Sequence, residues 1–367
     1  MTIRSGATRL SRTFTVAAAA FAVLVLSSCA ANEMGLPPAG PDALSGTLNG
    51  SGASSQSSAS DAWVASFQTD NPDATVNYSP DGSGAGRKAF ISGGVQYAGS
   101  DSALSERELS ETFSGCAAGG RGIDLPVYVS PIAVIFNIKG VENLNLDAAT
   151  IAGIFKGTIT RWNDPAVAAL NPGTPLPAGT ITAVHRSDDS GTTRNFTDYL
   201  GQVAPQVWDE PPDDSFPYQN GEAAQGTSGV VEAVGGGVNT IGYSDASRAG
   251  HLGIAKLNVG GSFVTLSTKA AAAVVAGSPL VEGRESNDIA VELDRKTTDS
   301  SHYPLVLVSY MIACDHYQDA ATAKLVKAYL HHVVSSRGQA EAAKSAGSAP
   351  LSPELASRIT AAIDSIR

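Results

Sequence analysis

The chain has 367 residues, of which 43% are hydrophobic and 16% charged, a composition typical of an ordered protein with a sizeable core. The length is sufficient for two domains. The formal net charge of -11 argues against nucleic-acid binding through a general basic surface, and an anionic ligand would have to be held by local dipoles and a few cations.

Residues 1–28 have the pattern of a signal peptide. Three arginines precede an apolar stretch from Phe14 to Leu26, and no acidic residue interrupts them. The four residues that end at Cys29 resemble the lipobox of bacterial lipoproteins, so we expect cleavage before Cys29 and lipidation of its thiol. The alternative is an ordinary secretory signal with an incidental cysteine. Residues 29–44 would then comprise the lipidated cysteine and a flexible tether rich in Pro, Gly and Ala.

Cys116 and Cys314 are the remaining two of the three cysteines. An even pair in an exported chain predicts a disulfide. The alternative is two buried free thiols.

Strands and helices are predicted to alternate along the chain, with short turns between them. Such alternation is typical of an α/β protein whose ligand-binding turns lie at the carboxyl ends of strands. Two long apolar runs, Leu125–Ile138 and Tyr303–Ala313, are predicted to be strands that cross between domains. The other predicted strands lie at 44–48, 74–78, 95–98, 180–184 and 240–243, with a hairpin over 254–266. The predicted helices lie around 63–67 and 90–91 and over 106–113, 146–155, 193–203, 268–276, 320–334 and 353–366, with further helices after 165 and 226.

The turn between the strand at 180–184 and the helix at 193–203 carries a polar cluster. Ser190 is placed to cap the helix, and Gly191 permits a ligand to approach the backbone. The helix start and the guanidinium of Arg186 suit a phosphate-like oxyanion, and Asp188 is placed to orient that guanidinium. The alternative is a capped helix that follows a surface Arg–Asp pair.

Several kinds of catalytic site are not supported by the sequence. No Gly-Lys dipeptide of a P-loop occurs, and the Gly226–Val230 turn does not match the nucleophile elbow of hydrolases. The six histidines are scattered, and the adjacent His331 and His332 face different directions on a helix. We therefore predict no catalytic residue, no metal and no cofactor.

Four polar turns, taken together, resemble the phosphate-binding proteins of Pst-type ABC transporters. The motifs that carry this resemblance are Gly50-x-Gly52-Ala53-Ser54, Asn77-Tyr78-x-x-x-Gly82-Ser83-x-x-Gly86, Ser100-Asp101-x-x-Leu104-Ser105 and Arg186-x-Asp188-x-Ser190-Gly191-Thr192. Trp162-Asn163-Asp164-Pro165 and Ile241-Gly242-Tyr243 are similar to further family motifs. The match covers nearly all of the chain after the tether.

The resemblance implies a set of phosphate ligands and a disulfide. Asp188 would brace Arg186, and the crossing strands of the family fold would bring Cys116 and Cys314 within bridging distance. Ser55 stands where the family has a Phe, so it would offer only its backbone N–H. The ligand residues carried over from the family are Ser54, Ser55, Ser83, Asp101, Arg186, Ser190, Gly191 and Thr192.

The fold implied is a two-lobed α/β periplasmic-binding-protein fold with a ligand cleft between the lobes. Lobe one would combine residues 45–133 with 306–367, and lobe two would span 134–305. The expected function is high-affinity binding of inorganic phosphate outside the cytoplasm and its delivery to the permease subunits of an ABC transporter. The protein would be a monomer at the outer face of the cytoplasmic membrane, attached through its lipid alone.

Two rivals remain at this stage. One is a binding protein for another tetrahedral oxyanion such as sulfate, against which the carboxylate of Asp101 argues because it would repel an unprotonated anion. The other is a secreted phosphatase, which would need a nucleophile with a base, or a metal cluster. An additional role as an adhesin or antigen also stays open.

Overall fold

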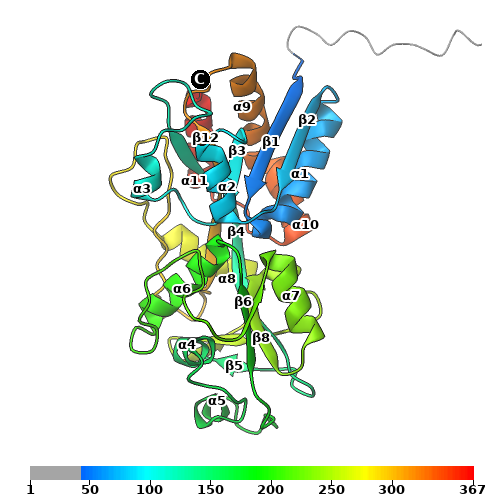
Figure 1. Cartoon of the computed structure of the whole chain (residues 1–367), viewed down its shortest axis with the longest axis vertical. Helices are drawn as coiled ribbons and strands as arrows, with labels where there is room; N and C mark the ends of the chain where they lie inside the picture. The colour runs from blue at the N-terminus through cyan, green and yellow to red at the C-terminus, as the bar shows by residue number, and fades with distance from the viewer. Residues whose placement is uncertain (1–42) are drawn as a thin grey trace, which may run out of the picture. The chain divides into compact units, whose positions relative to one another are not determined.

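The computed structural model describes residues 43–367, and most of its strands belong to a single sheet. The strand order in that sheet is β2-β1-β3-β12-β4-β8-β6-β7, with β9 paired to β4 (Figure 1). The predictions for residues 1–42, namely the signal peptide, the lipidated Cys29 and most of the tether, lie outside the described residues. Among the described residues, no helix is both long and apolar enough to cross a membrane.

Two half-sheets meet along the strand β4, Gly122–Asn137. Up to Pro131 this strand pairs antiparallel with β12, and from Ile132 it pairs antiparallel with β8. We call the strands on the β12 side of this change the first half-sheet and those on the β8 side the second half-sheet. The strands predicted at 125–138 and 303–313 are confirmed as β4 and β12, although β12 begins later, at Val306. Of the two, β4 passes from one half-sheet to the other, whereas β12 pairs with β3 and with the first part of β4.

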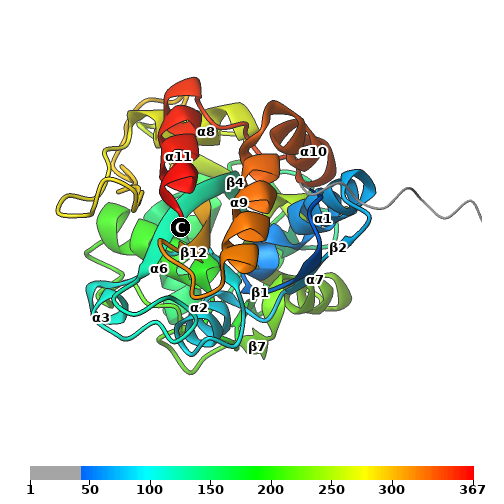
Figure 2. The ribbon, with the colours of Figure 1, turned by 90° about the horizontal axis from the view of Figure 1, so that it is seen from above.

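The first half-sheet repeats a unit in which a strand leads into a polar turn and then a helix. Strands β1, β2 and β3 pair in parallel, so their carboxyl ends meet at one edge. Its elements are β1 Gly46–Gly52, η1 Ser54–Gln56, α1 Ser57–Asp70, β2 Ala74–Ser79, α2 Ser83–Ile91, β3 Tyr97–Ser100, α3 Glu106–Leu109, β12 Val306–Cys314, α9 Ala320–Val334, α10 Ser336–Ala346 and α11 Pro353–Ser365. Seen from above, α1, α9 and α10 lie on one side of this half-sheet (Figure 2).

The second half-sheet repeats the same succession of strand, polar turn and helix. Strand β6 pairs in parallel with β8 and β7, and α6 and α7 follow β6 and β7. Its elements are α4 Ala148–Lys156, α5 Pro165–Leu170, β6 Thr182–Arg186, α6 Gly191–Val203, β7 Glu222–Ala224, α7 Gly226–Gly236, β8 Thr240–Asp245, η2 Ala246–Arg248 and β9 Gly253–Ile254. A separate three-stranded sheet and one further helix complete the fold, with β5 Asn145–Leu146, β10 Lys256–Val259, β11 Ser262–Val264 and α8 Thr268–Gly277.

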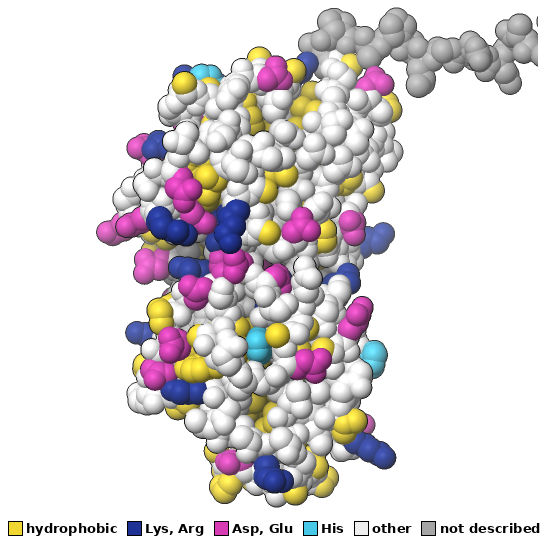
Figure 3. Space-filling model, in the orientation of Figure 1, with side chains coloured by type: hydrophobic (Ala, Val, Ile, Leu, Met, Phe, Trp, Pro, Cys, Tyr) yellow, Lys and Arg dark blue, Asp and Glu magenta, His cyan; other side chains and the backbone are white. Residues whose placement is uncertain are grey.

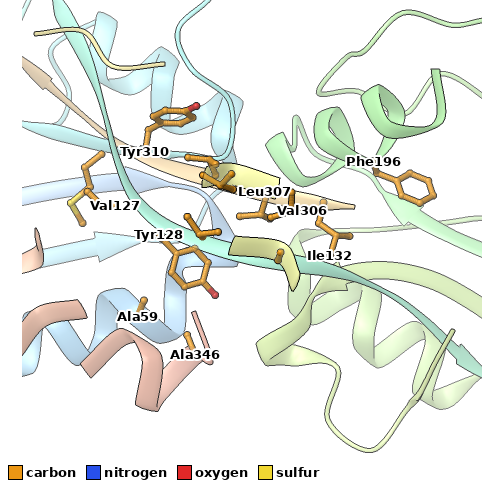
Figure 4. Packing of buried hydrophobic residues seen from close by; sticks show 14 of the residues in the cluster. Ala59, Val127, Tyr128, Ile132, Phe196, Val306, Leu307, Tyr310 and Ala346 are labelled. Carbon is orange, nitrogen blue, oxygen red and sulfur yellow. The ribbon is translucent and has the colours of Figure 1, made fainter. Parts of the chain in front are cut away.

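One hydrophobic core extends along both crossing strands. In β4 every residue except Asn137 is buried, and all of β12 is buried, because helices or loops cover both faces there. Figure 4 shows Ile132, Val306 and Leu307 packed side by side where the two strands cross, with Phe196 of α6 nearby. Continuous burial explains why both strands are apolar runs without polar alternation.

The structure differs from the predicted helices in two places: one predicted helix is shorter, and one helix was missed. The helix expected over 106–113 is a single turn that begins after its N-cap Ser105 and ends at Leu109, with Ser110 as its C-cap. Helix α10 was not predicted at all. Its buried positions are mostly small or polar, including Gly338 and Gln339, so the sequence carries little hydrophobic periodicity there.

Cys116 and Cys314 form a disulfide, as predicted, across a sequence separation of 198 residues. Cys314 is the last residue of β12, and Cys116 lies in the loop before β4. The bridge therefore ties the loop before one crossing strand to the end of the other.

Candidate functional site

The carboxylate of Asp101 is the centre of a buried polar cluster. Asp101 follows the last residue of β3 and accepts hydrogen bonds from three hydroxyl groups. Ser55 and Ser309 donate to Oδ1 at 2.6 and 2.5 Å, and Thr192 donates to Oδ2 at 2.9 Å. Burial raises the pKa of Asp101 above its usual value, and these hydrogen bonds and the charge of Arg186 oppose the rise only in part. The three hydroxyl donors are nevertheless the partners that an ionised carboxylate, which only accepts hydrogen bonds, requires.

The turn before α2 brings Ser83 against Asp101. The backbone N–H of Asp101 donates to Ser83 Oγ at 3.1 Å. Gly82 has a φ of 105°, and a Cβ atom there would lie 2.6 Å from a carboxylate oxygen of Asp188. Only glycine fits this position, because it has both the required backbone conformation and no side chain.

Arg186, the last residue of β6, points its guanidinium at Asp188. The pair is bidentate: Nε donates to Oδ1 at 2.8 Å and Nη2 donates to Oδ2. Burial opposes ionisation of Asp188, yet its hydrogen bonds and charge interaction with Arg186 outweigh burial and lower its pKa. The pair expected from the sequence is therefore present, and its role in holding a ligand-binding guanidinium stays a prediction. Among the described residues Asp188 takes one N–H of Nε and one of Nη2, so three of the five N–H donors of Arg186, two of them on Nη1, are left for a ligand.

The start of α6 adds backbone donors to the cluster. Ser190 caps the helix as predicted, accepting a hydrogen bond from the Thr193 N–H at 3.2 Å. The N–H groups of Gly191 and Thr192 lie in the first turn, where a helix offers no acceptor of its own. A Cβ atom at Gly191 would lie 2.7 Å from both Asp101 Cβ and Ser83 Oγ, so α6 approaches the first half-sheet closely because this residue is glycine.

Ser54 lies at the opposite side of the cluster and contacts α7. Its hydroxyl lies 2.9 Å from the Thr227 hydroxyl and accepts a hydrogen bond of 3.1 Å from the Thr227 N–H. Ser54 and Ser55 are both buried at the end of the first Gly-rich turn. Ser55, for which only a backbone role was expected, instead uses its hydroxyl on Asp101.

Further contacts join the two half-sheets around the cluster. Arg87 forms a buried ion pair with Asp214, and Lys88 forms an exposed pair with Asp189 at 2.7 Å. The backbone N–H of Gly84 also donates to the Asp189 carbonyl at 3.0 Å. The structure is thus closed over the polar turns.

All eight residues predicted to bind the ligand are buried, and they converge where the carboxyl ends of β1, β2, β3 and β6 meet α6. The cluster offers hydroxyl groups, backbone N–H groups, one guanidinium and one carboxylate. Such a set suits a small oxyanion that carries a proton. Within residues 43–367 no cluster of His, Cys, Asp and Glu has the arrangement of a metal site.

Sequence reasoning missed three residues of this cluster. Ser309 is a lone polar residue in the predicted crossing strand, which was a usable signal. Thr227 lies in a Gly-rich turn that was recognised only as the start of a helix. Gln56, whose amide contacts Ser309, has no distinguishing pattern in the sequence.

Comparison with protein families and curated proteins gives consistent matches. The sequence model of the PBP superfamily domain matches residues 37–337. The phosphate-binding protein PstS 3 of Mycobacterium leprae is 34% identical over 326 residues, which cover 87% of this chain and 87% of that protein. The phosphate-binding protein PstS 3 of Mycobacterium tuberculosis is 35% identical over 326 residues, covering 87% of this chain and 86% of that protein.

Solved structures show the same fold. A high-affinity periplasmic phosphate-binding protein, PfluDING, bound with phosphate, has a TM-score of 0.70 at 22% identity, over 86% of this chain and 93% of that chain. A phosphate ABC transporter substrate-binding protein from Clostridium perfringens, with bound phosphate, has a TM-score of 0.60 at 19% identity, over 84% and 100% of the two chains. The expected two-lobed periplasmic-binding-protein fold is therefore confirmed.

Proposed function

Since this chain belongs to the PstS family of phosphate-binding proteins, we propose that it binds inorganic phosphate at the Asp101 cluster and delivers it to the membrane subunits of an ABC transporter. It is a binding protein in this proposal and performs no covalent chemistry on its ligand. The two relatives named above are themselves described as phosphate-binding proteins.

The observation that carries the proposal is a carboxylate inside an oxyanion site. At neutral pH inorganic phosphate keeps at least one proton, whereas sulfate keeps none. An ionised carboxylate only accepts hydrogen bonds, so Asp101 pairs with a P–O–H group and repels a bare anion. Neutral donors and the guanidinium of Arg186 would hold the remaining oxygens.

The ligand residues we propose are the eight predicted from the sequence, and the structure adds a second role for Ser55. Ser54 is proposed to contact phosphate by its hydroxyl, and Ser55 by its backbone N–H only, because the Ser55 hydroxyl is used on Asp101. Arg186, braced by Asp188, supplies the cation. The other proposed ligands are Ser83, Asp101, Ser190, Gly191 and Thr192.

Phosphate binding is proposed to shift the protein toward the closed arrangement. We assign residues 45–133 and 306–367 to lobe one and 134–305 to lobe two, with the cluster between them. The contacts of Asp101 with Thr192 and of Ser54 with Thr227 join these two parts, so a ligand that holds both sides favours closure. The closed form would be the one that the permease recognises.

We also propose the cellular setting that the leader suggests. Residues 1–28 direct export, Cys29 carries the lipid, and the tether holds a monomer at the outer face of the cytoplasmic membrane. On the face of the protein drawn in Figure 3, basic side chains lie among acidic ones, in keeping with the net charge of -11, which argues against a general nucleic-acid surface.

The deciding experiment is calorimetric titration of the exported domain, from residue 44 onward, with phosphate, arsenate and sulfate. We expect tight binding of phosphate, comparable binding of arsenate, which is also protonated at neutral pH, and little binding of sulfate. Equal binding of sulfate would favour the rival oxyanion binder. Turnover of a chromogenic phosphate ester would favour the phosphatase.

A further inference from the structure

Ser309 lies on the crossing strand β12, directly against the carboxylate of Asp101. Its neighbour Tyr310 pairs with Ser100, so Ser309 lies opposite Asp101 just beyond the end of the β3–β12 ladder. The register between β12 and β4 shifts between Ser309 and Tyr310. Such irregularities next to a binding site re-aim side chains. Here the Ser309 hydroxyl lies 2.5 Å from Asp101 Oδ1.

The direction of this hydrogen bond is set by Gln56. Its Nε2 lies 2.9 Å from the Tyr310 carbonyl oxygen and 2.7 Å from Ser309 Oγ. A carbonyl only accepts, so the amide must present its nitrogen, and the second N–H then donates to Ser309 Oγ. The single proton of Ser309 is therefore directed to Asp101, and Asp101 is held as an acceptor.

The remaining acceptor capacity of Asp101 matches one ligand proton. An ionised carboxylate offers about four acceptor sites. The hydroxyls of Ser55, Ser309 and Thr192 occupy three of them. One site stays free, which suits an anion that brings one P–O–H group to this carboxylate.

We propose that Ser309, oriented by Gln56, is a specificity-determining positioning residue: it holds the Asp101 carboxylate as an acceptor, so that the site takes protonated oxyanions and rejects unprotonated ones. The identity of the anion rests on the proposed function, but the action of Ser309 on Asp101 does not. Ser309, Gln56, Ser55 and Asp101 all belong to the first half-sheet or its turns, so the arrangement does not require closure around a ligand.

Other charged groups act on Asp101 from neighbouring elements. Burial raises the pKa of Asp101 overall, the charge of Arg186 on β6 opposes that rise, and Tyr78 on β2 interacts electrostatically with Asp101. A cavity of about 330 Å³ borders Asp101 on another side. Its charged lining residues are Arg194, Asp198, Arg284, Glu292 and Arg295. Substitution of Ser309 leaves all of these groups in place, so a change in the titration of the Asp101 carboxyl group can be attributed to the lost hydroxyl.

The first test measures Asp101 itself in ligand-free protein. A ¹³C titration of aspartate carboxyl carbons, with the Asp101 resonance identified by its loss in Asp101→Asn, is recorded for the parent, Ser309→Ala, Ser309→Thr and Ser130→Ala. Ser130 is the matched control, because it is a fully buried serine on the other crossing strand whose hydroxyl donates to the Pro131 carbonyl. We expect Ser309→Ala to move the Asp101 titration upward by about one to two pH units, since a hydrogen bond to a charged group changes an equilibrium about ten- to a hundredfold. Ser309→Thr should restore the parent value, and Ser130→Ala should not change it.

The second test measures selectivity in the same variants. We expect the ratio of phosphate to sulfate affinity to fall about tenfold or more in Ser309→Ala, and the loss of phosphate binding on acidification to begin at higher pH. Gln56→Met should change the affinity ratio and the pH dependence in the same direction as Ser309→Ala, but by less. Phosphate itself changes its protonation with pH, but equally for every variant, so a comparison of variants at the same pH removes this contribution to the affinity. An unchanged Asp101 titration in Ser309→Ala would overturn the inference even if the parent binds phosphate. A parent that binds no phosphate would instead overturn the proposed function.

Discussion

The hydroxyl of Thr192 donates a hydrogen bond of 2.9 Å to the carboxylate of Asp101 and so joins the first turn of α6 to the end of β3. The two residues are 91 positions apart in the chain, and they belong to different half-sheets. An anion bound beside this hydrogen bond would contact both elements at once. This is the geometric reason for our proposal that ligand binding favours the closed arrangement.

Asp101→Asn should change the selectivity of the site. The amide oxygen can still accept from Ser55 and Ser309, while the amide nitrogen can donate to an unprotonated oxyanion. We expect the ratio of phosphate to sulfate affinity to fall by about tenfold or more, chiefly because repulsion of sulfate is relieved. Calorimetry with both anions measures this ratio. Asp81→Asn, in the neighbouring turn where Asp81 accepts only from Ser51, is the control and should behave as the parent.

Arg186→Ala should weaken phosphate binding without preventing folding. The change removes a charge-assisted contact, typically about 1.5–3 kcal/mol, and leaves Asp188 facing an anion without its partner. The expected loss of affinity is about ten- to a hundredfold. Arg161→Ala, which removes an exposed arginine that donates to the Ala178 carbonyl, should bind normally. Near-parental affinity in Arg186→Ala would mean that the anion binds elsewhere.

Loss of the Cys116–Cys314 bridge should destabilise the protein. The bridge closes a loop with a sequence separation of 198, so the entropy model predicts a decrease of about 5 kcal/mol in the free energy of unfolding. Urea unfolding of the parent and of the Cys116→Ala/Cys314→Ala double variant measures the difference. Titration of the denatured, unreduced domain should find no free thiol; two thiols per chain would contradict the bridge.

The stability of the protein should decrease between about pH 4 and pH 6 through Asp245. Burial raises the pKa of Asp245 from 3.8 to about 6, although hydrogen bonds from Ser247 and Tyr128 partly oppose it. The folded state thus holds this proton more tightly than the unfolded state. Its contribution is fully present below about pH 4 and is lost as the pH rises through about 6.

Asp245→Asn should remove this pH dependence. The amide can accept from Ser247 through Oδ1 and face the Tyr128 hydroxyl with its nitrogen, so the fold is retained. Relative to the variant, the parent should lose up to about 3 kcal/mol between pH 4 and pH 7. Denaturant unfolding at several pH values gives the two curves. Parallel curves would show that Asp245 titrates normally.

Cys29→Ala should abolish lipidation. We expect the protein to leave the membrane fraction, or to accumulate with its leader uncleaved, because the acylated thiol is its proposed attachment. Fractionation of cells, together with mass determination of the amino-terminal peptide, measures both outcomes. Full membrane retention of this variant with its leader cleaved would contradict the lipoprotein proposal.

The amino-acid sequence alone was sufficient to predict most of the longer elements of this protein and most residues of the polar cluster around Asp101. Apolar runs predicted both crossing strands, and the strand-turn-helix pattern around Ser190 predicted the cap of α6 and the Arg186–Asp188 pair. These features depend on local periodicity and turn chemistry, which neighbouring residues encode. Helix α10 was missed because its buried face is made of small and polar residues.

Only the tertiary structure decided how the polar turns act on one another. Ser309 is 208 residues from Asp101, and Thr227 is 173 residues from Ser54. No local pattern specifies such contacts, because they depend on which strands pair and in which register. The same reason applies to Ser55: its position predicted a backbone contact, but the closeness of β3 and η1 directs its hydroxyl to Asp101. Long-range strand pairing therefore brings a set of ordinary Gly- and Ser-rich turns together into one buried polar cluster, the proposed phosphate site, with the Asp101 carboxylate at its centre.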